Sequence, residues 1–349
     1  MKWTFVAATE AAEYASRWDA LNAAGARSPL LTSQFLGSAL MAFGTGKEKL
    51  AILGDLLAPA AMAVVERSSR PGVWQTFQPS QAPIGFFLKR ADLSVETVLA
   101  RLLRDLPGLA VLFGLTQQDP LLIARPEPGV VTKTLDYIET ASIDVGGAFE
   151  AYWEQRGKNL RQNLRKVRNK LDKAGLAIQL DCLTAADQMR EAVASYGAME
   201  SKGWKSRQGT AISLDNDQGR FYLDLLTRHC QAGHGRVYQL RLGDQVVAMD
   251  ICIDLEGVIV ILKTTYDEAA AEYSPAMLMH HEIFQHLFES GEFRRIEFYG
   301  KVMEWHTRWT EDKRTMYHVN QYRWPLIKTL VERRSRPAPA SAPSVETSQ

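Results

Sequence analysis

The stretch "RVYQLRLGDQVVAMDICIDLEGVIVILKTTYD", residues 236–267, decides the fold. It contains three strand-like runs separated by the turn dipeptides Gly243-Asp244 and Glu256-Gly257. This pattern predicts three antiparallel strands joined by short hairpin loops. The next stretch, "EAAAEYSPAMLMHHE" (268–282), starts a helix at Ser274-Pro275. A meander followed by a helix predicts an α+β fold in which helices cover a mixed sheet.

The rest of the chain supports two domains of similar order, helices first and strands afterwards. Helices are expected over 149–173, 185–201, 218–233 and 275–290, and strands over 293–300 and 316–324. The first half reads similarly, with a hairpin near Gly54-Asp55. We therefore expect domains over 1–145 and 146–332, each a mixed, largely antiparallel sheet flanked by helices. The Pro/Ala/Ser-rich tail, 333–349, is expected to be disordered.

Composition narrows the function classes. The 349 residues carry a formal net charge of +1, which argues against a dedicated nucleic-acid-binding protein, DNA-binding proteins included, and leaves room for a local basic patch. The three cysteines have no CxxC spacing, so no disulfide or zinc framework is expected. The start of the chain does not read as a secretory signal, and no apolar run reaches the ~18 residues of a membrane span. We expect a cytoplasmic protein without a transmembrane segment.

Four stretches resemble a known superfamily. They are "YWEQRGKNLRQNLRKVRNKLDKAG" (152–175), "ESKGWKSRQGTAI" (200–212), "LKTTYDEAAAEYSPAMLM" (262–279) and "EWHTRWTEDKR" (304–314). They resemble the GNAT acyltransferases, in the CelD/BcsL branch associated with cellulose and exopolysaccharide biosynthesis, and more distantly the FemAB-type aminoacyl transferases. The resemblance spans residues 150–315 and implies two tandem GNAT-like domains. The first would be a degenerate scaffold or acceptor-binding domain, and the second would be catalytic.

The resemblance implies an activity. We expect acyl-CoA-dependent N-acyl transfer, with acetyl-CoA or another acyl-CoA as co-substrate and no metal. The acceptor would be an amine of a sugar or polysaccharide precursor. One alternative is FemAB-type transfer from aminoacyl-tRNA, and another is a non-catalytic binding subunit of a polysaccharide-synthesis assembly. The chain departs from the GNAT pattern at "AAAEYSPAMLM" (269–279), which has no glycine where the family has a Gly-rich pyrophosphate loop.

Two features indicate a site for a phosphorylated donor. The first turn of the helix at Ser274 presents unpaired amides, including those of Ala276 and Met277, at the positive end of the helix dipole. The helix over 149–173 carries an apolar stripe and an excess of positive charge, with Arg161 and Arg165 on its basic face. A capped helix facing solvent and an ordinary solvated face are the structural alternatives.

The candidate catalytic residues lie in or after the strands. Lys263 interrupts an apolar run, so its ammonium needs a partner or a wet cleft. A two-residue loop at Glu256-Gly257 would place Asp250 opposite Lys263, either as a structural ion pair or in the acceptor cleft. Asp250 is the candidate base. Tyr266 and Tyr299 are candidate proton donors to the leaving thiolate, with plain packing roles as the alternative.

Loop aromatic and charged residues supply the candidate substrate walls. These are Trp204, Lys205, Asp267, Trp305 and Trp309. The string "HHEIFQH" (280–286) is not a zinc motif, because His281 and His286 are five residues apart and do not share a helix face. A structural role is expected for His306. No nucleophile elbow or P-loop is present.

Overall fold

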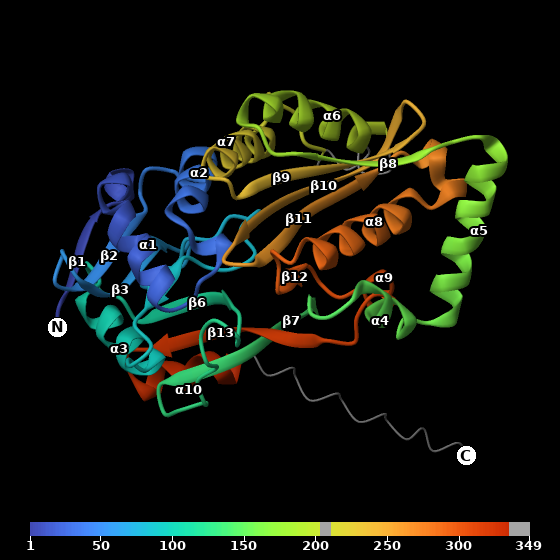
Figure 1. Ribbon diagram of the computed structural model, residues 1–349. Coiled ribbons are helices and arrows are strands. Elements are labelled where there is room, and N and C mark those ends of the chain that lie inside the picture. The colour runs from blue at the N-terminus through green and yellow to red at the C-terminus, as the bar shows by residue number, and fades with distance from the viewer. Residues whose placement is uncertain (203–210, 335–349) are drawn as a thin grey trace, which may run out of the picture.

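The computed structural model describes residues 1–202 and 211–334 (Figure 1). The predicted wall residues Trp204 and Lys205 lie outside the described residues, as does nearly all of the predicted tail.

The first half of the chain contains three α-helices and seven strands among the described residues. In chain order these are β1 (Trp3–Ala7), α1 (Ala15–Ala24), α2 (Ser33–Phe43), β2 (Lys49–Gly54), β3 (Pro59–Arg67), β4 (Val73–Thr76), β5 (Phe87–Lys89), α3 (Val95–Asp105), β6 (Leu112–Gln118) and β7 (Thr132–Asp144).

The second half contains the predicted meander and the helices around it. Its elements are α4 (Phe149–Glu154), α5 (Lys158–Ala174), β8 (Ile178–Leu183), α6 (Met189–Lys202), α7 (Asp217–Gln231), β9 (Gly235–Leu242), β10 (Gln245–Leu255), β11 (Val258–Tyr266), the 3₁₀ helix η5 (Glu268–Tyr273), α8 (Pro275–Ser290), β12 (Arg295–Glu297), α9 (Glu304–Thr307), β13 (Lys313–Tyr322) and α10 (Pro325–Arg334).

The described strands form one mixed sheet, in the order β1-β2-β3-β4-β6-β13-β7-β12-β11-β10-β9-β8, with β5 paired to β3. Helices α6 and α7 lie on one side of β9–β11 and α8 lies on the other (Figure 1). This confirms the α+β class. The C-terminal strand β13 lies between β6 and β7, so the last strand of the chain pairs with strands of the first half. The domain boundary near residue 145 stays a prediction.

Three apolar clusters hold the layers together. One fills the space between α1, α2, α6, α7 and the sheet, and therefore spans both halves. A second lies between α5, α8 and the opposite face of β8–β12, and a third lies under α3. The apolar stripe predicted for the basic helix is confirmed, because Leu160, Leu164, Val167 and Leu171 are buried. The single helix predicted over 149–173 is two helices in the structure, because α4 ends at Glu154 and α5 begins at Lys158.

The meander has the predicted turns but a shifted register. Glu256 and Gly257 both have positive φ angles, 46° and 77°, as a type I′ turn requires. Between Ile251 and Cys252 the pairing with β11 shifts by one residue, so Ile251 pairs with Lys263 and Asp250 pairs with Thr264. The predicted Asp250–Lys263 pairing is therefore wrong. A β-bulge inserts one extra residue into β11 and sends the two side chains to opposite faces of the sheet.

Candidate active site

The site forms where two neighbouring parallel strands separate. β11 and β12 pair over only three positions, Val258–Val260 with Arg295–Glu297. Beyond Val260, β11 continues to Tyr266, whereas its neighbour β12 ends at Glu297. The gap opens toward both faces of the sheet, and a cavity lies on each face beside it.

The larger cavity, which we call the α8 cavity, has a volume of about 820 Å³. Its walls come from the first turns of α8, the outer half of β11 and the segment that contains α9. They are predominantly apolar, with Met277, Phe298, Trp305 and Trp309 among them. Lys301 and Arg308 supply positive charge. A cavity with largely apolar walls and basic side chains among its lining residues suits a molecule with an apolar arm and an anionic head.

The first turn of α8 has the form of an anion site. Pro275 has no N–H, and Ser274 takes a left-handed conformation (φ 48°) without a side-chain capping bond. The predicted side-chain cap is therefore absent. Leu278 donates to the carbonyl of Ser274, so the amides of Ala276 and Met277 remain unpaired by the helix, and both residues line the α8 cavity.

A second cavity of about 450 Å³, the glutamine cavity, lies on the other face. Both halves of the chain build it. The loop between β4 and β5 contributes Gln78, Ser80 and Gln81, the end of β6 contributes Gln117, and α7 contributes Gln218. Amide and hydroxyl groups dominate the polar part of this wall, and no carboxylate is among its lining residues in the described chain.

The two cavities share one wall. Ile261, Leu262, Lys263, Phe298 and Gly300 line both of them, so the two cavities adjoin at the splayed strands, and we call this shared stretch the passage. Lys263 is the charged side chain in that shared wall. Groups bound in the two cavities would come near one another beside Lys263.

Lys263 has a buried acidic partner. Its Nζ lies 3.2 Å from Oε1 of Glu200, a residue of α6 that is 2% exposed. The second oxygen of Glu200 accepts a hydrogen bond of 2.8 Å from the amide of Ile212. The ammonium also lies 5.6 Å from the centre of the Tyr222 ring. These contacts keep the charge at the passage and offset the cost of its burial.

Asp250 does not reach either cavity directly. It is fully buried on the α8 side of the sheet, with its Oδ2 atom 3.2 Å from Nε2 of His280. The atoms are close, but the geometry is not that of an aligned hydrogen bond. His280 itself lines the α8 cavity. The predicted base is thus separated from the α8 cavity by a histidine.

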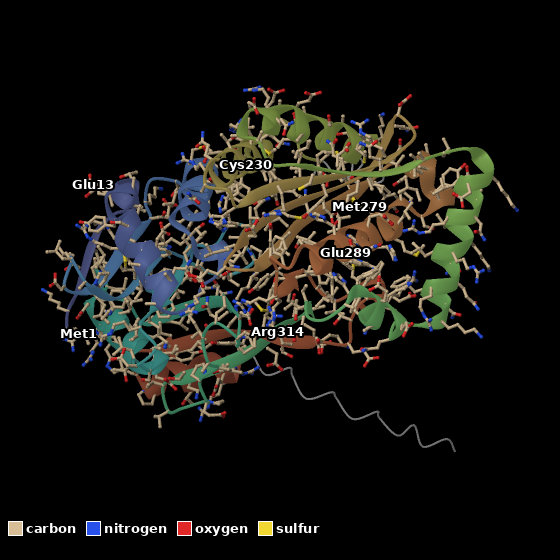
Figure 2. All side chains as sticks on the ribbon, viewed as in Figure 1. Met1, Glu13, Cys230, Met279, Glu289 and Arg314 are labelled. Carbon is tan, nitrogen blue, oxygen red and sulfur yellow. The ribbon has the colours of Figure 1, made fainter. Side chains whose placement is uncertain are left out.

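Tyr299 lies in the glutamine cavity rather than in the α8 cavity. Its hydroxyl donates to Asp119 (2.8 Å), which in turn accepts two hydrogen bonds from Arg314 at 2.9 and 2.6 Å. Arg314, marked in Figure 2 beside β7, also binds Glu297 at 2.7 Å. Burial, reinforced by Asp119, raises the pKa of Tyr299, so its proton stays on the phenol at neutral pH.

The other predicted residues divide between the α8 cavity and places outside it. Tyr266, Trp305 and Trp309 line the α8 cavity, with Tyr266 40% exposed at its edge. Asp267 instead caps η5 through the amide of Ala269 and accepts a bond from Gln245. Arg161 and Arg165 are exposed and line none of the cavities described. The residue of α5 that lines the α8 cavity is Leu160, which belongs to the apolar stripe and not to the basic face.

Several site residues have no individual sequence signal. Glu200, Gly300 and the glutamines of the first half belong to ordinary helical or loop patterns. The sequence does contain a signal for the position of His280. It follows Met277 by three residues and precedes Phe284 by four, and this spacing places all three on one face of the helix. Local backbone conformation marks the site as well. Gln117 (φ 40°), Tyr299 (φ 47°) and Ser274 have rare left-handed conformations, and each lines a cavity.

Comparison with known proteins bears on the fold and the class of domain. Residues 158–307 match the family model described as an acetyltransferase (GNAT) domain. No curated protein is significantly similar to the chain in sequence.

Solved structures share the fold over nearly the whole chain. FemX is 8% identical, with a TM-score of 0.58 over 95% of this chain and 100% of that chain. L-PGS from Bacillus licheniformis is 15% identical, with a TM-score of 0.56 over 91% and 95%. The C-terminal DUF2156 domain of a protein named as a candidate lysylphosphatidylglycerol synthetase, from Agrobacterium fabrum, is 14% identical, with a TM-score of 0.57 over 93% and 96%.

The matched domain defines the class of protein. Residues 158–307, under half of the chain, match a GNAT acetyltransferase domain, and on that match the chain is an acyl-transferring enzyme. In the described part of the chain, no helix has both the length and the apolar character that crossing a bilayer would require.

Proposed function

We propose that the chain transfers an acyl group, expected to be acetyl, from acyl-CoA to an amine of a sugar or polysaccharide precursor. The observation that carries the proposal is the shared wall between two cavities on opposite faces of the sheet. Donor and acceptor would enter from different sides and meet beside Lys263. The CelD/BcsL resemblance suggests exopolysaccharide or cellulose biosynthesis as the context, and an acyl-CoA donor suggests a cytoplasmic site of action.

The α8 cavity suits the donor. Its apolar length would hold the pantetheine arm, and the amides of Ala276 and Met277 would bind the pyrophosphate in place of the absent glycine loop. A polar cavity of about 510 Å³ shares Leu160, Met277 and Arg308 with it and leads to the start of α5. That neighbouring space would receive the nucleotide end.

The glutamine cavity suits a polyhydroxylated acceptor. Side-chain amides both donate and accept hydrogen bonds, which matches the alternating donors and acceptors of sugar hydroxyls. Among the described residues the wall offers no carboxylate to hold a protonated amine, so the neutral, nucleophilic form is favoured. The first half of the chain would then be the acceptor-binding domain.

At the passage, the amine nitrogen attacks the thioester carbonyl carbon. A C–N bond forms, the C–S bond breaks, and one proton moves from nitrogen to sulfur. The Lys263 ammonium would stabilise the negative charge that develops on the carbonyl oxygen, and Glu200 holds it there. Binding both substrates on one sheet supplies the orientation.

Calorimetry with acetyl-CoA, longer acyl-CoAs and free CoA tests the donor. A ligand at a hundred times its dissociation constant should raise the free energy of unfolding by about 2.7 kcal/mol. Acetyl-CoA with a panel of amino sugars, followed by thiol release and by the added mass of the product, tests the transfer. No binding of any CoA species would end the proposal.

Transfer from aminoacyl-tRNA is the second candidate. It is favoured by four exposed cations of α5, Lys158, Arg165, Lys166 and Lys173, for which the described structure shows no ion pair. Binding of tRNA that weakens steeply with salt and is lost in an Arg161→Ala, Arg165→Ala, Lys166→Ala variant would support it. Undiminished acetyl-CoA turnover in the same variant would favour the first proposal.

A further inference from the structure

His280 is a buried polar residue in an otherwise apolar layer. It lies in the second turn of α8 and is 3% exposed, with its ring stacked on Phe284 (5.5 Å between centroids) and on Trp305 (5.3 Å). Several sheet residues on the same face are apolar, among them Ala248, Cys252 and Ile261. The position would hold an apolar side chain equally well in a purely structural role.

Asp250, which lies against His280, is also an unusual residue for this layer. Asp250 is 0% exposed, and neither of its carboxylate oxygens has an aligned hydrogen bond in the described structure. Its Oδ2 atom faces His280 Nε2 at 3.2 Å. A buried carboxylate without hydrogen bonds is costly, and such groups persist where they serve a function. Catalytic hydrogen bonds are also often poorly aligned before substrate binds.

The two ring nitrogens of His280 have different surroundings. Nε2 is buried against Asp250, whereas Nδ1 has no hydrogen-bond partner among the described residues and is not sealed off. The residue lines the α8 cavity. A carboxylate that holds one ring nitrogen fixes the tautomer and leaves the other nitrogen as a proton acceptor.

We propose that His280 carries the proton of the transfer and that Asp250 is its positioning residue. The proposal rests on the proposed function. Nδ1 accepts the proton of the attacking amine as the C–N bond forms, and Asp250 stabilises the resulting imidazolium through Nε2–H. The same Nδ1–H then protonates the sulfur as the C–S bond breaks. Nitrogen and sulfur share one carbon at that moment, so one imidazole can serve both, and no net proton is gained or lost.

The predicted proton donors are less well placed for the thiolate. The Tyr299 hydroxyl is bonded to Asp119 in the other cavity, and Tyr266 lies at the exposed edge of the α8 cavity. His306, close to His280, has its Nδ1 occupied by the amide of Met303. Burial lowers the pKa of His306 to about 4, so it stays neutral at pH 7. The charged residues that line this cavity in the described structure are Lys263, Lys301 and Arg308, and Asp250 lies behind His280.

The decisive comparison is His280→Gln against His286→Gln in the full chain. His286 lies on the same helix but is exposed and lines none of the cavities described. With acetyl-CoA and glucosamine we expect His280→Gln to lower the single-turnover rate by about 10²- to 10⁴-fold, with the Kd for acetyl-CoA within about threefold of wild type. Imidazole should restore part of the rate in His280→Ala. A His280→Gln rate within about threefold of wild type would overturn the role.

A second measurement does not depend on turnover. In ¹⁵N-histidine-labelled protein we expect His280 to be the Nε2–H tautomer, and Asp250→Asn to change its tautomer population. A wild-type Nδ1–H tautomer would contradict the proposal. If wild type binds no acyl-CoA and gives no thiol release, the proposed function itself fails. Normal wild-type turnover with an unaffected His280→Gln variant sinks only the proton-carrier role.

Discussion

Lys263 Nζ and Glu200 Oε1 lie 3.2 Å apart at the passage between the two cavities, on the face of the sheet opposite to Asp250. The pair links β11, the third strand of the meander, to α6. Glu200 also accepts a hydrogen bond from the Ile212 amide, in the segment that precedes α7. The Lys263 ammonium, at the proposed reaction centre, is therefore held by the core of the second half.

Lys263→Met should lower both stability and activity. It removes one charged partner of the buried Glu200 carboxylate, which should lower the free energy of unfolding by about 3 kcal/mol. It also removes the group that polarises the carbonyl, which should lower the rate by about 10²-fold or more. Urea unfolding and single-turnover kinetics measure the two effects.

The double variant Lys263→Met, Glu200→Gln separates the two roles. Both members are then neutral, and the amide of Gln can still accept from Ile212, so stability should return to within about 1 kcal/mol of wild type. The rate should stay low. Recovery of both stability and rate would show that the pair is only structural.

The position of Lys263 also shows what the sequence could predict. Turn residues and apolar periodicity predicted the meander, the start of α8 and the buried stripe of α5, because these depend on local chemistry. The β-bulge in β11 has no such signature, and a shift of one residue exchanged the partners of Lys263 and Asp250. Partners that come from elsewhere in the chain, such as Glu200 and His280, follow from packing alone.

The cavities illustrate the same limit. Trp305 and Trp309 could be named from a loop pattern, and both line the α8 cavity. Arg161 and Arg165 were chosen because helix periodicity gives the basic face, but periodicity does not say which way that face points. Gln78 and Gln117 lie in the first half, and only the complete sheet brings them beside β11.

Ser274→Asp should weaken donor binding without harming the fold. A carboxylate at this position repels a pyrophosphate, and the dissociation constant for acetyl-CoA should rise by about tenfold or more. A helix with no ligand at its start would instead gain slightly from the added charge. Asp also tolerates the left-handed conformation that Ser274 adopts.

The matched control for this change is Ser274→Asn, which has the same shape without the charge. Calorimetry should give it an acetyl-CoA affinity within about threefold of wild type. Equal affinities for the Asp and Asn variants would show that the start of α8 does not bind the phosphates.

Gly300→Leu should close the passage. Gly300 lines both cavities and has no left-handed φ, and a Cβ there meets only the Phe298 carbonyl oxygen at 3.8 Å. The fold should therefore accept the side chain, and the thermal midpoint should change little. We expect retained acetyl-CoA binding and a loss of transfer of about 10²-fold or more, because a misplacement of this size separates the reacting atoms.

Gly146→Leu is the control for that substitution, since its Cβ would have open space around it and it lines none of the cavities described. It should transfer at the wild-type rate. A Gly300→Leu variant as active as this control would mean that the substrates do not meet at the shared wall.

Ionisation of Glu297 should make the free energy of unfolding fall as the pH rises. Burial raises the pKa of this carboxyl from 4.5 to about 7, although Arg314 and Arg295 lower it in part. Between these values the folded protein keeps a proton that the unfolded chain has released. The slope of unfolding free energy against pH is therefore negative in this window, with a total contribution of about 3 kcal/mol. At lower pH both states bind the proton, and above pH 7 the loss is complete.

Glu297→Gln isolates this contribution, because the histidines with lowered pKa values, such as His306, titrate alike in both proteins. Loss of the carboxylate next to Arg314 shifts the variant's curve of unfolding free energy against pH by a constant amount. The difference in unfolding free energy, variant minus wild type, should rise by about 2–3 kcal/mol between pH 4.5 and 7.5. Urea unfolding at closely spaced pH values measures it. Parallel curves across that range would mean that Arg314 keeps Glu297 ionised in the folded protein, and that the buried network carries its charges permanently.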